Sequence, residues 1–105
     1  MFERDLRIAE TFKRLVERRV PVRRILAFGS RAKGNAGPES DLDLFVEVEQ
    51  RTPEIREYIS HCAWEAGFDE GVVVTTVVFT REELENTAEG HSPLVKNVLR
   101  EGIAV

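Results

Sequence analysis

Two short segments contain residues whose types and spacing could do chemistry. The first is Gly29-Ser30-Arg31-Ala32-Lys33-Gly34, which follows an apolar run. A Gly-Ser turn that leaves a buried strand can present backbone N–H groups and a hydroxyl to an anion. Arg31 and Lys33 add positive charge beside that turn. The segment therefore predicts half of a phosphate-binding site.

The second segment, Ser40-Asp41-Leu42-Asp43-Leu44, supplies a pair of carboxylates. On a strand, Asp41 and Asp43 would project to the same side with Cα atoms about 6.5 Å apart. Two carboxylates held together repel each other, whereas a hard cation such as Mg²⁺ stabilises both as anions. Phosphate donors on one side and a bound Mg²⁺ on the other are the parts needed for phosphoryl transfer from a nucleoside triphosphate.

The elements that must position these residues can be predicted from periodicity. From Asp41 to Glu49 the chain alternates strictly, with Leu42, Leu44, Val46 and Val48 on one face. The rest of the pattern predicts amphipathic helices and apolar strands. We expect helices over 3–19, from the Thr52 cap to Gly67, from the Thr80 capping box onward, and from Ser92 to Gly102, and strands over 24–29, 42–49 and 72–79.

This order of elements predicts a single domain over residues 1–105, of the α/β (α+β) class. We expect the strands to form one small mixed sheet with helices packed on it. The uninterrupted β-branched run from Val72 to Phe79 suggests that its strand is central and covered on both faces.

Composition excludes several classes of function. The 15 basic residues against 19 acidic ones give a net charge of −4, which argues against binding duplex DNA or an anionic membrane surface. A lone cysteine, Cys62, cannot form an internal disulfide or a Cys-rich zinc site. No targeting signal or membrane span is visible, so we expect a cytoplasmic protein.

Other motifs fail at particular residues. A Walker A loop would need Lys and Ser or Thr where Asn35 and Ala36 stand, and an EF-hand would need an oxygen ligand and a glycine at Phe45 and Val46. Adjacent residues on a helix point about 100° apart, which argues against a His61–Cys62 dyad.

The Gly-Ser turn, a spacer of about ten residues and the Asp-x-Asp pair together resemble the signature of the polymerase-beta-like nucleotidyltransferase superfamily, in particular its minimal nucleotidyltransferases. The resemblance implies the fold of that superfamily, ATP as substrate and Mg²⁺ as cofactor. It implies that Asp41 and Asp43 are catalytic and bind the metal. It also implies that the nucleotide-binding residues are Gly29, Ser30, Arg31 and Lys33.

Active relatives carry a third acid on a neighbouring strand, and this chain departs from them there. The segment 71–79 contains no acid. Alignment by apolar pattern puts Thr76 at the third-acid position, with Thr75 as the other possibility. Glu47 shares the face of Asp43, but four residues along an extended strand is about 13 Å, too far to bind the same ion.

Two functional hypotheses follow from the resemblance. The first is Mg²⁺-dependent transfer of AMP from ATP to a hydroxyl of a protein partner, as the antitoxin of a HEPN/MNT-type pair. The second is a nucleotide-binding or partner-binding module with little or no activity, which neutralises a partner by docking. A purely structural interpretation treats Asp41 and Asp43 as solvated strand-end charges. The sequence is also compatible with a homo-oligomer.

Overall fold

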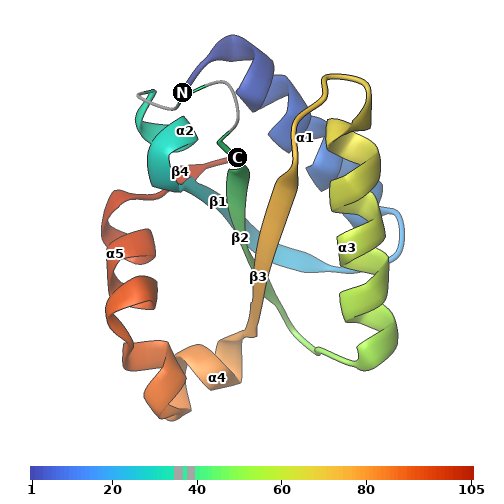
Figure 1. Ribbon diagram of the computed structural model, residues 1–105. Helices are drawn as coiled ribbons and strands as arrows, with labels where there is room; N and C mark the ends of the chain where they lie inside the picture. The colour runs from blue at the N-terminus through green and yellow to red at the C-terminus, as the bar shows by residue number, and fades with distance from the viewer. Residues whose placement is uncertain (35–36, 38–39) are drawn as a thin grey trace.

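The computed structural model describes residues 1–34, 37 and 40–105. Asn35 and Ala36, which depart from the Walker A pattern, lie outside the described residues. Helices and strands alternate along most of the chain (Figure 1). In order they are α1 (Glu3–Glu17), β1 (Val22–Phe28), α2 (Gly29–Lys33), β2 (Leu42–Val48), α3 (Pro53–Phe68), β3 (Val74–Thr80), α4 (Arg81–Asn86), the 3₁₀ helix η1 (Ala88–His91), α5 (Pro93–Glu101) and β4 (Ile103–Ala104).

The strands form one mixed sheet in the order β3-β2-β1-β4. β1 runs antiparallel to β2 and to β4, whereas β2 and β3 are parallel. The predicted α/β class and mixed sheet are therefore confirmed. The expectation that the strand at 72–79 is central was wrong, because β3 lies at an edge of the sheet. The short strand β4 was not predicted.

The alternation of β2 divides the core into two layers. Leu42, Leu44, Val46 and Val48 are all buried in the larger cluster, with apolar side chains of α1 and α3. Phe45, on the opposite face, stacks on Phe79 at a ring distance of 5.6 Å and packs with residues of α5. Helices consequently cover both faces of the sheet (Figure 1). Asp43 shares the face of Phe45 by the same alternation.

The predicted helix starts are confirmed by their caps. The Thr52 hydroxyl accepts a hydrogen bond from the Ile55 N–H at 3.1 Å, just before Pro53. Thr80 and Glu83 form a reciprocal capping box at the start of α4. These bonds satisfy N–H groups that have no partner within the helix. α3 and α4 therefore begin where the sequence predicts.

The Cys62 side chain is only 1% exposed, in the α3 contact with the sheet. Burial raises the pKa of its thiol, because an apolar environment disfavours the thiolate. His61 instead lies on the exposed side of α3, where its ring stacks on Trp64. The two side chains therefore do not form a dyad, as the helix geometry predicts.

None of the helices among the described residues has both the length and the apolar character that crossing a membrane requires.

Candidate active site

Asp43 lies at the centre of the candidate site, on the second residue of β2. In the sheet it stands opposite Phe28 of β1 on one side and Thr75 of β3 on the other. The Asp43 side chain is half-buried, and Asp41, just before β2, is exposed. Because Phe28 is the last residue before α2, this register brings the Asp-x-Asp segment beside Gly29 and Ser30, which form the first turn of a short helix instead of the predicted Gly-Ser turn.

Gly29 begins α2 in direct proximity to the Asp43 carboxylate. Its φ of +79° is a conformation that L side chains rarely adopt, and a Cβ placed there would lie 2.6 Å from Asp43 Oδ2. Any side chain at this position would therefore displace the carboxylate. The structure confirms that the two motifs meet, and it gives the reason for a glycine at this position.

Thr75, rather than Thr76, faces Asp43. The Thr75 hydroxyl donates a hydrogen bond to Asp43 Oδ1 at 2.5 Å. Thr76 stands opposite Leu44, which points into the α1 and α3 side of the core. Alignment by apolar pattern placed the third-acid position one residue too far along, and a shift of one residue moves a side chain to the other face of the sheet. The geometry selects the alternative, Thr75.

Arg31 is turned into the protein instead of toward a nucleotide. The Arg31 guanidinium is 3% exposed and lies 3.0 Å from the Asp5 carboxylate of α1, which is fully buried. The Arg31 Nε also donates to the carbonyl of Ser40 at 2.5 Å. Arg31 thus connects α2 to α1 and to the residue before Asp41. Its predicted contact with the triphosphate is corrected to a positioning role.

Replacing Asp5 with asparagine is expected to destabilise the fold by about 3–5 kcal/mol, because the buried guanidinium loses the carboxylate that faces it. Urea unfolding followed by circular dichroism measures this loss. Arg7→Ala is the matched control, since Arg7 lies on the same helix in an exposed ion pair with Glu70. It should change stability by no more than about 0.5 kcal/mol. Equal effects of the two substitutions would contradict the assignment.

The remaining predicted nucleotide-binding residues face solvent. Ser30 is exposed on the first turn of α2. Lys33 is 60% exposed and lies 3.8 Å from Glu101 of α5, a surface ion pair that is weak in water. Both side chains can therefore turn toward a phosphate without breaking a buried contact.

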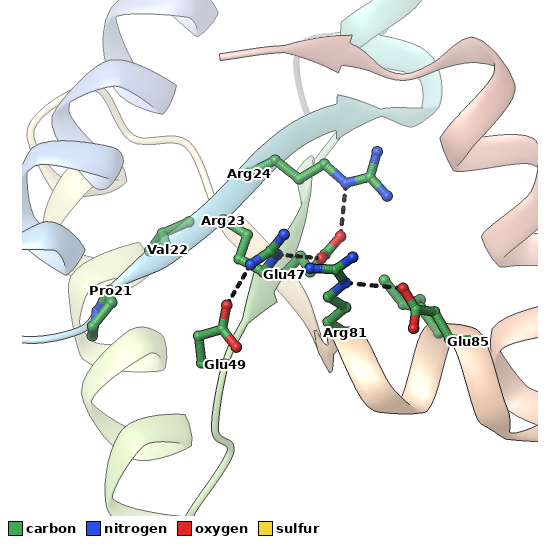
Figure 2. A pocket seen from close by; sticks show the side chains of 9 residues that line it. Pro21, Val22, Arg23, Arg24, Glu47, Glu49, Arg81 and Glu85 are labelled. Carbon is green, nitrogen blue, oxygen red and sulfur yellow. Dashed lines mark hydrogen bonds and ion pairs between the residues drawn. The ribbon is translucent and has the colours of Figure 1, made fainter.

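Glu47, on the same face as Asp43, belongs to a different feature. The Glu47 carboxylate is 5% exposed and accepts hydrogen bonds from Arg23 at 3.1 Å and Arg24 at 2.8 Å (Figure 2). These residues line a cavity of about 760 Å³ with Arg81, Glu49 and Glu85. Three arginines are matched there by three glutamates. The cavity therefore has no excess positive charge that would attract a triphosphate. The Glu47 carboxylate is engaged by these arginines and not by the Asp41–Asp43 segment, as its spacing along the strand predicts.

Among the described residues, no three His, Cys, Asp or Glu side chains gather closely enough to hold a metal ion. The carboxylates available as a donor set here are that of Asp43, which accepts a hydrogen bond from the Thr75 hydroxyl on the β3 side, and that of Asp41, which is exposed just before β2. Mg²⁺ is commonly held by one or two carboxylates together with substrate phosphates. The donor set suits that arrangement.

Comparisons with known proteins agree with this fold. One solved structure, described as "Crystal structure of the toxin-antitoxin with AMP-PNP", superimposes with a TM-score of 0.65 at 20% sequence identity, covering 90% of this chain and 69% of that chain. No curated protein matches the chain significantly. The family model described as "Nucleotidyltransferase domain" matches residues 8–105. With the polymerase-beta-like fold around Gly29 and Asp43, the chain belongs to the nucleotidyltransferase domain family.

Proposed function

We propose that this protein is a Mg²⁺-dependent nucleotidyltransferase that transfers AMP from ATP to a hydroxyl of a protein partner. The observation that carries the proposal is the close approach of Gly29, at the start of α2, to the Asp43 carboxylate, which leaves no room for a side chain at residue 29. A phosphate bound at that turn would lie beside the carboxylates. Family membership supports transfer of a nucleotide rather than hydrolysis or simple cation storage.

Asp41 and Asp43 would hold the Mg²⁺ ion. When bound, the ion neutralises charge on the phosphates and on the leaving pyrophosphate. Thr75 Oγ1 donates to Asp43 Oδ1, which fixes the orientation of this carboxylate and leaves Oδ2 toward Gly29. The described residues thus supply an orienting contact for Asp43 without a third negative charge.

The first turn of α2 would receive the phosphates of the nucleotide. Its leading N–H groups have no partner within the helix, and the exposed Ser30 hydroxyl lies on the same turn. Lys33 adds a positive charge at the end of α2. Arg31, through Asp5 and the Ser40 carbonyl, keeps this turn and the segment before Asp41 in place.

A protein acceptor is supported by the likeness to a chain from a toxin–antitoxin complex that contains AMP-PNP. We propose that this protein acts as the antitoxin of a HEPN/MNT-type pair and that the accepting hydroxyl belongs to the toxin. We place the pair in the cytosol, because the single buried cysteine forms no internal disulfide.

Thr75 favours a second candidate function. A threonine hydroxyl stays neutral at pH 7 and is a weak base, so it cannot replace a carboxylate that accepts the acceptor's proton. The second candidate is a module that binds nucleotide or toxin and neutralises the toxin by docking alone.

The two candidates are separated by incubating the protein with ATP labelled at the α-phosphate and Mg²⁺, first alone and then with the product of the neighbouring reading frame. We expect the label on the partner protein, with little transfer by the isolated chain, because a prepositioned acceptor hydroxyl contributes most of the rate. In a parallel incubation with ATP labelled at the γ-phosphate, label on the partner protein would contradict nucleotidyl transfer. Toxin neutralised without any label would select the docking module.

A further inference from the structure

The strand at the open edge of the sheet, β3, lacks the charged residues and proline by which natural edge strands avoid pairing. β3 lies at the edge, and its sequence, Val74 to Thr80, contains no charge, proline or glycine. Native edges are generally protected by such residues or covered by another element. A seven-residue uncharged edge strand therefore indicates a surface that something covers.

The backbone groups that point outward from this edge can be identified. The Val73 carbonyl accepts from the Leu42 N–H, so residue 73 faces β2 and the outward residues are Val74, Thr76 and Val78. A hydrogen bond shows that the Val78 carbonyl points away from β2, because it accepts from Arg51 Nη1 at 2.8 Å. Arg51 thereby occupies the end of the edge. The outward N–H and C=O groups of Val74 and Thr76 have no partner among the described residues.

One end of the same edge is aromatic. Trp64 and Phe68 of α3 are 60% and 63% exposed, with ring centroids 4.9 Å apart, and Val73 is 61% exposed. They border a cavity of about 410 Å³ between α3 and the start of β3. Contiguous exposed apolar side chains of this size mark interaction sites. We call Trp64, Phe68 and Val73 the aromatic end.

The other end of the edge is basic. A smaller cavity of about 200 Å³ is lined by Arg51 and Arg56 together with Thr76 and Val78. Ser60 lines both cavities, so the groove between α3 and the edge strand continues from one end to the other. Arg56 has no ion-pair partner among the described residues. We call Arg51 and Arg56 the arginine end.

We propose that a second copy of this chain covers this edge by antiparallel pairing of β3 with β3. Val74 of each copy pairs with Thr76 of the other, around a two-fold axis at Thr75, so that four hydrogen bonds satisfy the outward groups. The Val78 carbonyl keeps its bond to Arg51. The proposal does not rest on the proposed nucleotide transfer.

Complementarity of the two ends favours a second copy over an unrelated partner. A two-fold axis perpendicular to the sheet keeps both copies of α3 on the same face and reverses their direction. The arginine end of one copy then meets the aromatic end of the other. A guanidinium over an indole face is favourable, and Asp69, directly after Phe68, adds a negative charge at the same end. One surface thus carries both halves of the contact.

The test is the mass of the purified protein by light scattering over a range of concentrations, with the fluorescence of Trp64, the single tryptophan, recorded in parallel. We expect twice the 12.0 kDa of one chain, falling on dilution together with a shift of Trp64 emission to longer wavelength. Thr76→Pro removes only an outward N–H and is tolerated on an edge. It and Trp64→Glu should each raise the dimer Kd by at least about tenfold.

Leu94→Glu is the control, because it changes an exposed leucine on α5, away from this edge, and should leave the dimer unchanged. Circular dichroism verifies that each variant is folded. Because Trp64 is already exposed in one chain, Trp64→Glu decides the question even where Thr76→Pro does not fold. A wild-type protein that is monomeric at every concentration would overturn the proposal and leave the edge to a different partner. A dimer that survives both folded variants would also overturn it.

Discussion

Replacing Asp43 with asparagine is expected to lower the Mg²⁺-dependent affinity for ATP by at least about 10- to 100-fold, which is the loss seen when groups that merely support metal ligands are removed. Asparagine keeps the size of the side chain and can still accept the Thr75 hydrogen bond. It loses the charge that would hold the metal next to the phosphates. Isothermal titration calorimetry with ATP, in the presence and absence of Mg²⁺, measures the change.

The matched control for this experiment is Asp69→Asn, which removes the same charge from an exposed position after α3. It should bind ATP as the wild type does. Asp41→Asn is expected to act in the same direction as Asp43→Asn, because both carboxylates belong to the proposed donor set. If Asp43→Asn binds ATP and Mg²⁺ as tightly as Asp69→Asn, the metal site is not at these carboxylates.

The elements of this fold could be predicted where periodicity and caps agree. The alternation from Leu42 to Val48 assigns each residue of β2 to the correct face, because one side is buried under α1 and α3. Thr52 and Thr80 mark their helix starts by residue type alone. Neither pattern depends on distant parts of the chain, which is why the sequence is sufficient for them.

The buried pair of Asp5 and Arg31 could not be predicted from residue types. The charge of Arg31 favours a phosphate contact, and the charge of Asp5 is more typical of a solvated helix face than of a core. Asp5 in fact continues the buried stripe of Ile8, Ala9 and Phe12 on α1. The helical spacing of Asp5 was therefore the available signal. This spacing predicts a buried carboxylate only if a buried cation faces it, and that cation, Arg31, lies 26 residues away in the sequence.

The position of β3 in the sheet also could not be predicted. A continuous β-branched run is typical of a strand buried on both faces, and β3 has helices on both sides but no strand beyond it. The pattern reports on the faces of a strand and contains no information about its edges. Likewise, periodicity cannot distinguish Thr75 from Thr76, since the register with β2 is a property of the pair of strands.

Because Thr75 of β3 stands opposite Asp43 of β2, Thr75→Asp is expected to increase the rate of nucleotide transfer. A carboxylate at residue 75 would stand beside Asp43, where it could accept the proton of the acceptor hydroxyl or bind the metal, and general acid–base catalysis alone contributes about 10²- to 10⁴-fold. Thr75 is exposed, so the fold should tolerate the charge. Transfer of α-labelled AMP to the partner protein, at protein concentrations below any dimerisation, measures the gain.

Thr76→Asp separates this effect from a general effect of added charge. It introduces the same carboxylate one residue along, on the opposite face of β3, beside Arg51 and Arg56 instead of Asp43. Only the residue 75 variant should accelerate transfer, because only that side chain shares a face with the Asp-x-Asp pair. Acceleration by Thr76→Asp alone would mean that the strands slide by one residue in the active protein. Acceleration by neither would favour the docking module, because a carboxylate beside Asp43 would then not be sufficient to produce transfer.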